Sequence, residues 1–251
     1  MQRRRDRVLA GVGAAVAALS AAHGAHAGGD LRTVLSIPAP IVTQSHALDC
    51  ESASLQMALA ARGTMLDQET ILARLPKDPR PAVVEGFRDV HGTPVARVRR
   101  WGDPFRAFVG DPDRSERMAT GYGVYWPPIA TIARGAGHHV VAGTDIRPEL
   151  LYARLALGEP AIVWLPWNLL RRPTWRWRAW DGRRIVWNHA EHTMVLVGVD
   201  LVHDTVVLDD PDSPADPATG AEPYVGAQRT VPREEFESRY QDFHEMAVIV
   251  R

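Results

Sequence analysis

The only cysteine among 251 residues, Cys50, stands where an extended segment is predicted to turn into a helix. The mostly apolar run that follows it ends at Gly63, which suits a left-handed helix cap. A thiol at a helix N-terminus lies near unpaired N–H groups and the positive end of the helix dipole, which favour the nucleophilic thiolate. Gln44, upstream of the cysteine, carries an amide that can donate to an oxyanion forming beside the sulfur. These residue types predict a nucleophilic thiol.

Further segments form a pattern with Cys50 and Gln44: residues 49–54 (DCESAS), 122–128 (YGVYWPP), His192 with 193–200 (TMVLVGVD), and Asp210-Pro211. This pattern resembles the papain-like cysteine peptidases, and most closely the C39-like branch related to bacteriocin-processing peptidases. His192 follows Cys50 by 142 residues (192 − 50), and papain-type enzymes place their histidine about 130–150 residues after the cysteine. The sequence departs from many relatives at Glu51-Ser52, where they have Gly-Pro.

The resemblance implies a Cys-His-Asp triad acting on a peptide or protein substrate. Cys50 would be the nucleophile, His192 the base and acid, Asp210 the residue that orients His192, and Gln44 part of the oxyanion hole. Residues two apart share one face of a strand, so Asp210 and Asp209 face opposite sides, and the resemblance puts the orienting residue directly before the proline. No cofactor and no metal is implied.

Two other functions stay open beside the peptidase. The same residues serve amide transfer, so an amidase or acyltransferase is one alternative. The other is a degenerate C39-like fold that acts as a binding module of the cell envelope. The reactivity of the thiol separates this module from both enzymes.

The N-terminal residues predict a signal peptide. Four arginines occur within the first seven residues, an uncharged Ala-rich run follows at 8–22, and Ala25-His26-Ala27 fits a cleavage site. The run is shorter than the about 20 apolar residues of a membrane-spanning helix, and an uncleaved anchor is the alternative. We therefore expect a signal peptide at 1–27, one C39-like domain at 28–251, and a secreted or envelope (periplasmic) protein without stable membrane insertion.

Composition narrows the choice of partners. The formal net charge of −1 and the sequence pI near 6.8 argue against a nucleic-acid partner. A single cysteine cannot form an internal disulfide, so Cys50 either pairs with another molecule or is a reactive thiol. The oligomeric state is not determined by these features.

Four other clusters have alternative interpretations. His189 and His192 have a spacing that suits a metal pair on a helix, but the segment is strand-like. The cluster at 209–212 with Asp216 lacks the loop of a calcium site and is better explained as a turn, while His138-His139 is expected to be structural. Six tryptophans at 164–187, interleaved with arginines, fit either the core or a flap that contacts a ligand.

The pattern of elements predicts an α+β fold, with an N-terminal helical part packed on a C-terminal antiparallel sheet. Residues 76–127 show little periodicity, and Asp181-Gly182 is expected to turn a hairpin. Helices are predicted at 50–62, 64–75, 128–134, 148–157 and from 230 to 240, and strands at 139–143, 161–165, 192–199, 205–208 and 246–250.

Overall fold

The computed structural model describes residues 34–213 and 225–251, so the predicted signal peptide and cleavage site lie outside the described residues. Seven strands form the main sheet, in which every pairing is antiparallel. The order is β13-β12-β11-β8-β14-β7, and β1 pairs with the part of β11 beyond β8. The strands are β1 (Val34–Ser36), β7 (Val140–Gly143), β8 (Ala161–Pro166), β11 (Glu191–Asp200), β12 (Thr205–Ser213), β13 (Val225–Pro232) and β14 (Ala247–Val250).

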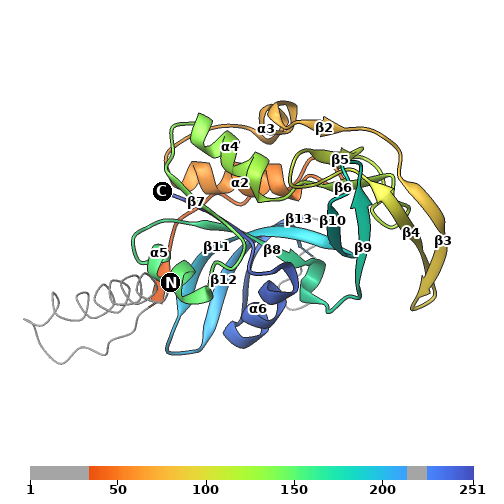
Figure 1. Cartoon of the computed structure of the whole chain (residues 1–251). Coiled ribbons are helices and arrows are strands. Elements are labelled where there is room, and N and C mark those ends of the chain that lie inside the picture. Colours follow the sequence, from red (N-terminus) through yellow and green to blue (C-terminus); the bar gives the residue numbers. More distant parts are fainter. Residues whose placement is uncertain (1–33, 214–224) are drawn as a thin grey trace, which may run out of the picture.

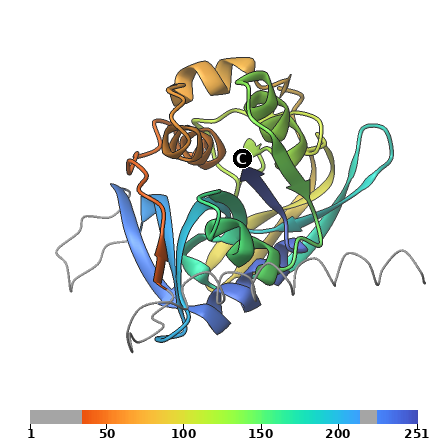
Figure 2. The ribbon, with the colours of Figure 1, turned by 90° about the vertical axis from the view of Figure 1, so that its left-hand side faces the viewer.

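Helices cover both faces of this sheet. Figure 1 shows α2 (Cys50–Ala61), α3 (Gln68–Arg74) and α4 (Trp126–Gly135) above the sheet and α6 (Arg233–Tyr240) below it. The view turned by 90° keeps α2 and α6 on opposite sides (Figure 2). Helix α2 packs on β8, β11 and β12, so these strands are covered on both sides and are buried along most of their lengths. A further helix, α5 (Pro148–Leu155), packs on β11.

Local signals explain where the helices begin and end. Gly63 follows α2 with φ of +79°, its N–H donates to Ala60 and the next N–H donates to Leu59, which is the Schellman arrangement. Asp67 caps α3 by accepting from the Thr70 N–H at 2.7 Å. Prolines occupy the first turn of both α4 and α5, where the missing N–H has no helical partner.

Two smaller sheets flank the body. One has the order β10-β9-β4-β3, and β9 and β10 form a hairpin around Gly182, as predicted. The other has the order β2-β5-β6. Their strands are β2 (Lys77–Asp78), β3 (Val83–Val90), β4 (Thr93–Trp101), β5 (Phe108–Gly110), β6 (Gly121–Gly123), β9 (Thr174–Ala179) and β10 (Arg184–Asn188).

The α+β class and the antiparallel sheet are confirmed. The strands between 77 and 123 were not predicted, and the residues at 230–232 end β13 instead of opening a helix. Within the described ranges, the structure contains no helix of the length and apolarity needed to cross a membrane.

Candidate active site

Cys50 is the first residue of α2, and its side chain is 5% exposed. Its Sγ lies 3.5 Å from Oε2 of Glu51, to which the thiol donates. One turn later along α2, Ser54 donates to the carbonyl oxygen of Thr193 in β11 at 3.2 Å and also contacts the Thr193 hydroxyl. These contacts place the start of the helix against the residue that follows His192.

The surroundings of the thiol favour its neutral form. Burial raises the pKa of Cys50 well above its ordinary value, and the carboxyls of Glu51 and Glu191 raise it further, while hydrogen bonding by Thr193 opposes them. The expectation that the helix end and His192 make this thiol a thiolate is therefore wrong for this conformation. The helix dipole is worth at most about 2 kcal/mol, which is less than the cost of a buried thiolate beside two carboxyls.

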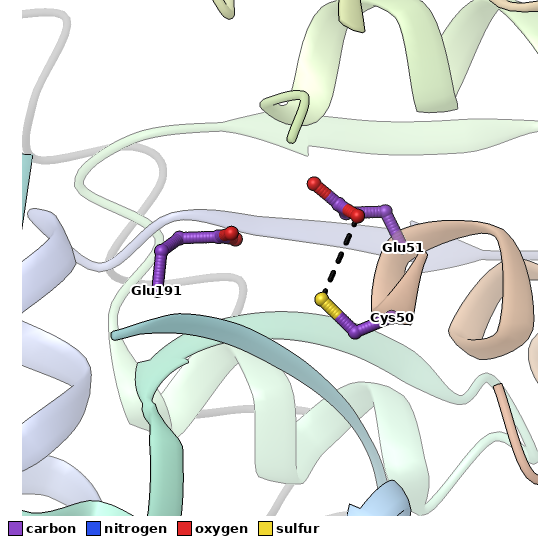
Figure 3. A group of neighbouring side chains, drawn as sticks. All are labelled: Cys50, Glu51 and Glu191. Carbon is purple, nitrogen blue, oxygen red and sulfur yellow. Dashed lines mark hydrogen bonds between the residues drawn. The ribbon is translucent and has the colours of Figure 1, made fainter. Parts of the chain in front are cut away.

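Two buried carboxyl groups converge near the sulfur, as Figure 3 shows. Oxygens of Glu51 and Glu191 and the Cys50 Sγ all lie within 4.8 Å of one another. Glu51 also accepts from the backbone N–H of Val124, and burial raises its pKa to about 8. Gly123, with φ of +134°, leaves the space that both carboxyls use, because a Cβ there would collide with Glu51 and crowd Glu191. Sequence reasoning missed both glutamates.

His192 and Asp210 are joined by a buried hydrogen bond. The imidazole Nε2 lies 2.7 Å from Oδ1 of Asp210, and the two side chains are 3% and 0% exposed. Asp210 also accepts from Nη1 of Arg229 at 3.0 Å and from the Asp212 N–H at 2.9 Å. Burial opposes ionisation, but His192, the Asp212 N–H and Arg229 together hold the pKa of Asp210 below its ordinary value. This bond uses Nε2 and leaves Nδ1 of His192 for another partner.

Asp209 lies on the other side of β12. It accepts from the Gln228 side chain at 2.9 Å, and burial raises its pKa. The strand alternation expected from the sequence therefore separates the two aspartates, and only Asp210 contacts His192.

Gln44 lies beside the end of β12. Its backbone N–H donates to the carbonyl oxygen of Pro211 at 3.0 Å, and its side-chain amide donates to Ala47 at 3.1 Å. The Gln44 side-chain oxygen is buried and has no hydrogen bond to a described residue. The Gln44 amide thus lies close to β12, the strand of Asp210, but its hydrogen bond is to Ala47 in its own loop.

The structure does not join all four predicted residues directly. Neither Cys50 nor Gln44 is hydrogen-bonded to His192, although all three are described in full. The seam between Ser54 and Thr193 links the helix of Cys50 to the strand of His192. The backbone bond from Gln44 to Pro211 links the upstream loop to the strand of Asp210.

The other clusters have structural contacts. His138 bonds to the Thr64 hydroxyl at 2.9 Å and to the Arg251 carbonyl. His189 packs edge-on against Trp175 and lies in the residues between β10 and β11, so it shares no helix face with His192. In the 209–212 cluster the carboxylates of Asp209 and Asp210 are engaged by side chains of β11 and β13, and Asp216 lies outside the described residues.

Some of the tryptophans between residues 164 and 187 lie in the core, and others are partly exposed. Trp164 and Trp177 belong to the core, at 0% and 2% exposed. Trp180 is half-buried between the guanidinium groups of Arg80 and Arg100, at 5.1 and 5.2 Å from its ring. A cavity of about 170 Å³ lies beside β10, and Tyr125 is one of the residues that line it. None of the four predicted site residues lines this cavity.

Known proteins share the fold and the sequence pattern of this chain. A crystal structure titled as a putative C39-like peptidase from Bacillus anthracis superposes with a TM-score of 0.66 at 23% identity, covering 88% of this chain and 98% of the other. A double glycine motif protease from an AMS/PCAT transporter, solved with its leader peptide, gives 0.43 at 16% identity, covering 86% and 91%. No curated protein matches the sequence. The model of the Peptidase_C39 like family matches residues 36–248, and the chain therefore belongs to that family.

Proposed function

We propose that this protein is an exported cysteine peptidase that uses Cys50, His192, Asp210 and Gln44. Membership of the family and the shared fold support a peptidase-type function. The buried 2.7 Å hydrogen bond between His192 and Asp210 carries the proposal, because a carboxylate that orients an imidazole is what a thiol nucleophile requires. Export rests on the basic and Ala-rich pattern at 1–27.

In the first half of the reaction, Cys50 attacks the carbonyl carbon of the scissile bond. The thiol gives up its contact with Glu51 and passes its proton to Nδ1 of His192, since Nε2 is held by Asp210. The substrate carbonyl becomes an oxyanion. The backbone N–H of Cys50, at the helix start, would stabilise it together with the Gln44 amide, which would first leave Ala47.

Collapse of the tetrahedral intermediate breaks the C–N bond and leaves a thioester on Cys50. His192 delivers its proton to the departing amine. Water then attacks the thioester with His192 as base, which releases the carboxylic acid and restores the thiol. Asp210 keeps the imidazole in one orientation through both halves, and the Asp210 charge is itself stabilised by Arg229.

The test is a peptide library incubated with the purified chain, with cleavage sites read by mass spectrometry. We expect a defined set of cleaved bonds that disappears in Cys50→Ala and in His192→Ala. Cleavage that persists in Cys50→Ala would overturn the proposal. Product formation only when an amine acceptor is added would instead identify an acyltransferase.

A second function is favoured by one observation. The thiol is buried, donates to Glu51 and has no hydrogen bond to His192. This arrangement suits a catalytically inactive module that binds peptides at the envelope. A folded chain that cleaves no library member but retains peptides on an affinity column would establish that function.

A further inference from the structure

We propose that Cys50, Glu51 and Glu191 form a binding site for one thiophilic divalent cation of the zinc type. This inference goes beyond the proposed peptidase, and its test does not depend on activity. One atom from each residue, the Sγ and a carboxylate oxygen of each glutamate, lies within 4.8 Å of the other two. Figure 3 shows the two carboxyls and the sulfur facing a common point.

An independent observation at Glu191 points to a ligand. Its side chain is 9% exposed, and its Oε1 is buried with no hydrogen-bond partner among the described residues. Leaving a buried carboxylate oxygen unpaired is costly, and native structures rarely do so. A cation between Glu191 and Cys50 would supply the missing interaction.

The distance between sulfur and oxygen suits tetrahedral zinc. Bonds of about 2.3 Å to sulfur and about 2.0 Å to a carboxylate, at the tetrahedral angle, separate the two ligand atoms by about 3.5 Å. Cys50 Sγ and Glu51 Oε2 are 3.5 Å apart. The second carboxyl reaches the same place because Gly123 has no side chain to exclude it.

The donor set decides which cation is bound. A thiolate selects zinc and its heavier relative cadmium over magnesium and calcium, which prefer oxygen ligands only. Binding moves the thiol proton, and any proton on the two carboxyls, to the buffer. The dication then offsets the repulsion among three anions, and a water molecule completes four ligands.

Occupation of this site would block Cys50 as a nucleophile. The sulfur cannot coordinate zinc and attack a carbonyl carbon at once. A chain that proves inactive on every peptide can still bind zinc here, and an active peptidase can lack the site, so the two proposals fail separately.

The experiment is calorimetric titration of the purified chain with Zn²⁺, with Co²⁺ as a spectroscopic probe of sulfur coordination. We expect one Zn²⁺ per chain, a thiolate-to-cobalt charge-transfer band, and no binding of Mg²⁺. Cys50→Ser should abolish the band, and Glu191→Gln should weaken Zn²⁺ binding at least ~10-fold, since even outer-sphere partners are worth that much.

A matched control is the exposed cluster at His46, which lies 2.7 Å from Asp113 and 3.1 Å from Glu69. His46→Ala should leave the stoichiometry and affinity unchanged. If Glu191→Gln does not fold, the cobalt spectra of the wild type and of Cys50→Ser still decide the question. Absence of Zn²⁺ binding, or binding that is lost in His46→Ala and kept in Cys50→Ser, would overturn the site.

Discussion

At the scale of single residues, the site combines a histidine that is oriented by a carboxylate with a cysteine whose surroundings favour the neutral thiol. Asp210 holds His192 through Nε2 and is itself held by Arg229, so the imidazole has one orientation. Cys50 has the opposite surroundings, because burial and two carboxyls disfavour its thiolate. In the proposed reaction the Cys50 thiol would have to leave Glu51, and the charge state of the two glutamates would control how readily the thiol ionises.

The first prediction concerns that control. Burial raises the pKa of Glu191 well above its ordinary value, so Glu191→Gln removes a carboxyl that becomes negative near Sγ only as the pH rises, and the substitution should lower the pKa of Cys50. Iodoacetamide labelling measured against pH should titrate above about 8.5 in the wild type and at a lower pH in the variant. Glu234→Gln, an exposed substitution on α6, serves as the control and should match the wild type. A wild-type thiol that titrates below 8.5 would show that the helix end and His192 dominate.

The second prediction separates the two neighbouring aspartates. Asp210→Ala should lower turnover by about 10³-fold or more, by analogy with the loss of other orienting carboxylates, and should destabilise the chain because Arg229 loses its partner. Asp210→Asn should be milder, since an amide oxygen still accepts from His192. Asp209→Ala breaks only the bond to Gln228 and should keep near-normal kcat. Equal losses of kcat in both alanine variants would contradict these roles.

At the scale of elements, the seam between α2 and β11 sets the position of Cys50 relative to His192. Ser54 bonds to both the carbonyl and the hydroxyl oxygen of Thr193, and these bonds tie the helix to the strand of His192. The cap at Gly63 stops the helix, and the packing of α2 on β8, β11 and β12 holds its first turn at the end of the sheet.

The third prediction tests this seam. Ser54→Ala should lower the free energy of unfolding by roughly 1–2 kcal/mol, because it removes the buried hydrogen bond between Ser54 and Thr193. Ser52→Ala is the matched control, being on the same helix and equally buried, with a hydroxyl that makes no hydrogen bond to β11. Urea unfolding should show Ser52→Ala to be neutral or stabilising. The seam has no special role if the two variants lose the same stability.

The elements also show how far sequence reasoning reaches. Helices and strands with a long apolar run, such as α2, β8 and β11, were predicted within about two residues. Strands β3 and β4 were missed because their exposed positions carry arginine, other polar residues and a proline, so that no apolar run marks them. The two strands pair with each other, and β4 also pairs with β9, which is distant in the sequence. Pairing between distant segments leaves no local period in the sequence.

One part of the candidate site was predicted from the sequence and another part was not. The bond between His192 and Asp210 was expected from the resemblance, which put the orienting residue directly before Pro211, while strand alternation put Asp209 on the other face. The convergence of Glu51 and Glu191 on Cys50 depends on how β11 meets α2 over Gly123, which no spacing reveals. Because of this packing the surroundings of Cys50 favour the neutral thiol, whereas a thiolate was expected from the sequence.

At the scale of the whole molecule, buried carboxyls couple folding to pH. Burial raises the pKa of Glu51 to about 8 and that of Asp49 to about 7, while the unfolded chain ionises near the ordinary values. Between about pH 4.5 and 8 the folded chain therefore holds protons that the unfolded chain has released. The ionisation of these two groups makes stability fall as the pH rises through this window.

The fourth prediction follows from that coupling. Glu51→Gln keeps an oxygen for the Val124 N–H but binds no proton, so its free energy of unfolding should fall less steeply between about pH 5 and 8. The difference in stability between variant and wild type should grow in favour of the variant as the pH rises. Urea unfolding at several pH values measures it. Parallel curves for the two proteins would mean that Glu51 ionises normally in the folded chain.

The central claim, that Cys50 is the nucleophile of a hydrolase, is tested most directly by partial alkylation. Because Cys50 is the only cysteine, iodoacetamide modifies one thiol, and intact mass gives the alkylated fraction. Turnover on a cleaved peptide is measured in the same samples. The account predicts that the fraction of activity lost equals the fraction of Cys50 alkylated at every time point. Full activity in a completely alkylated chain would contradict it.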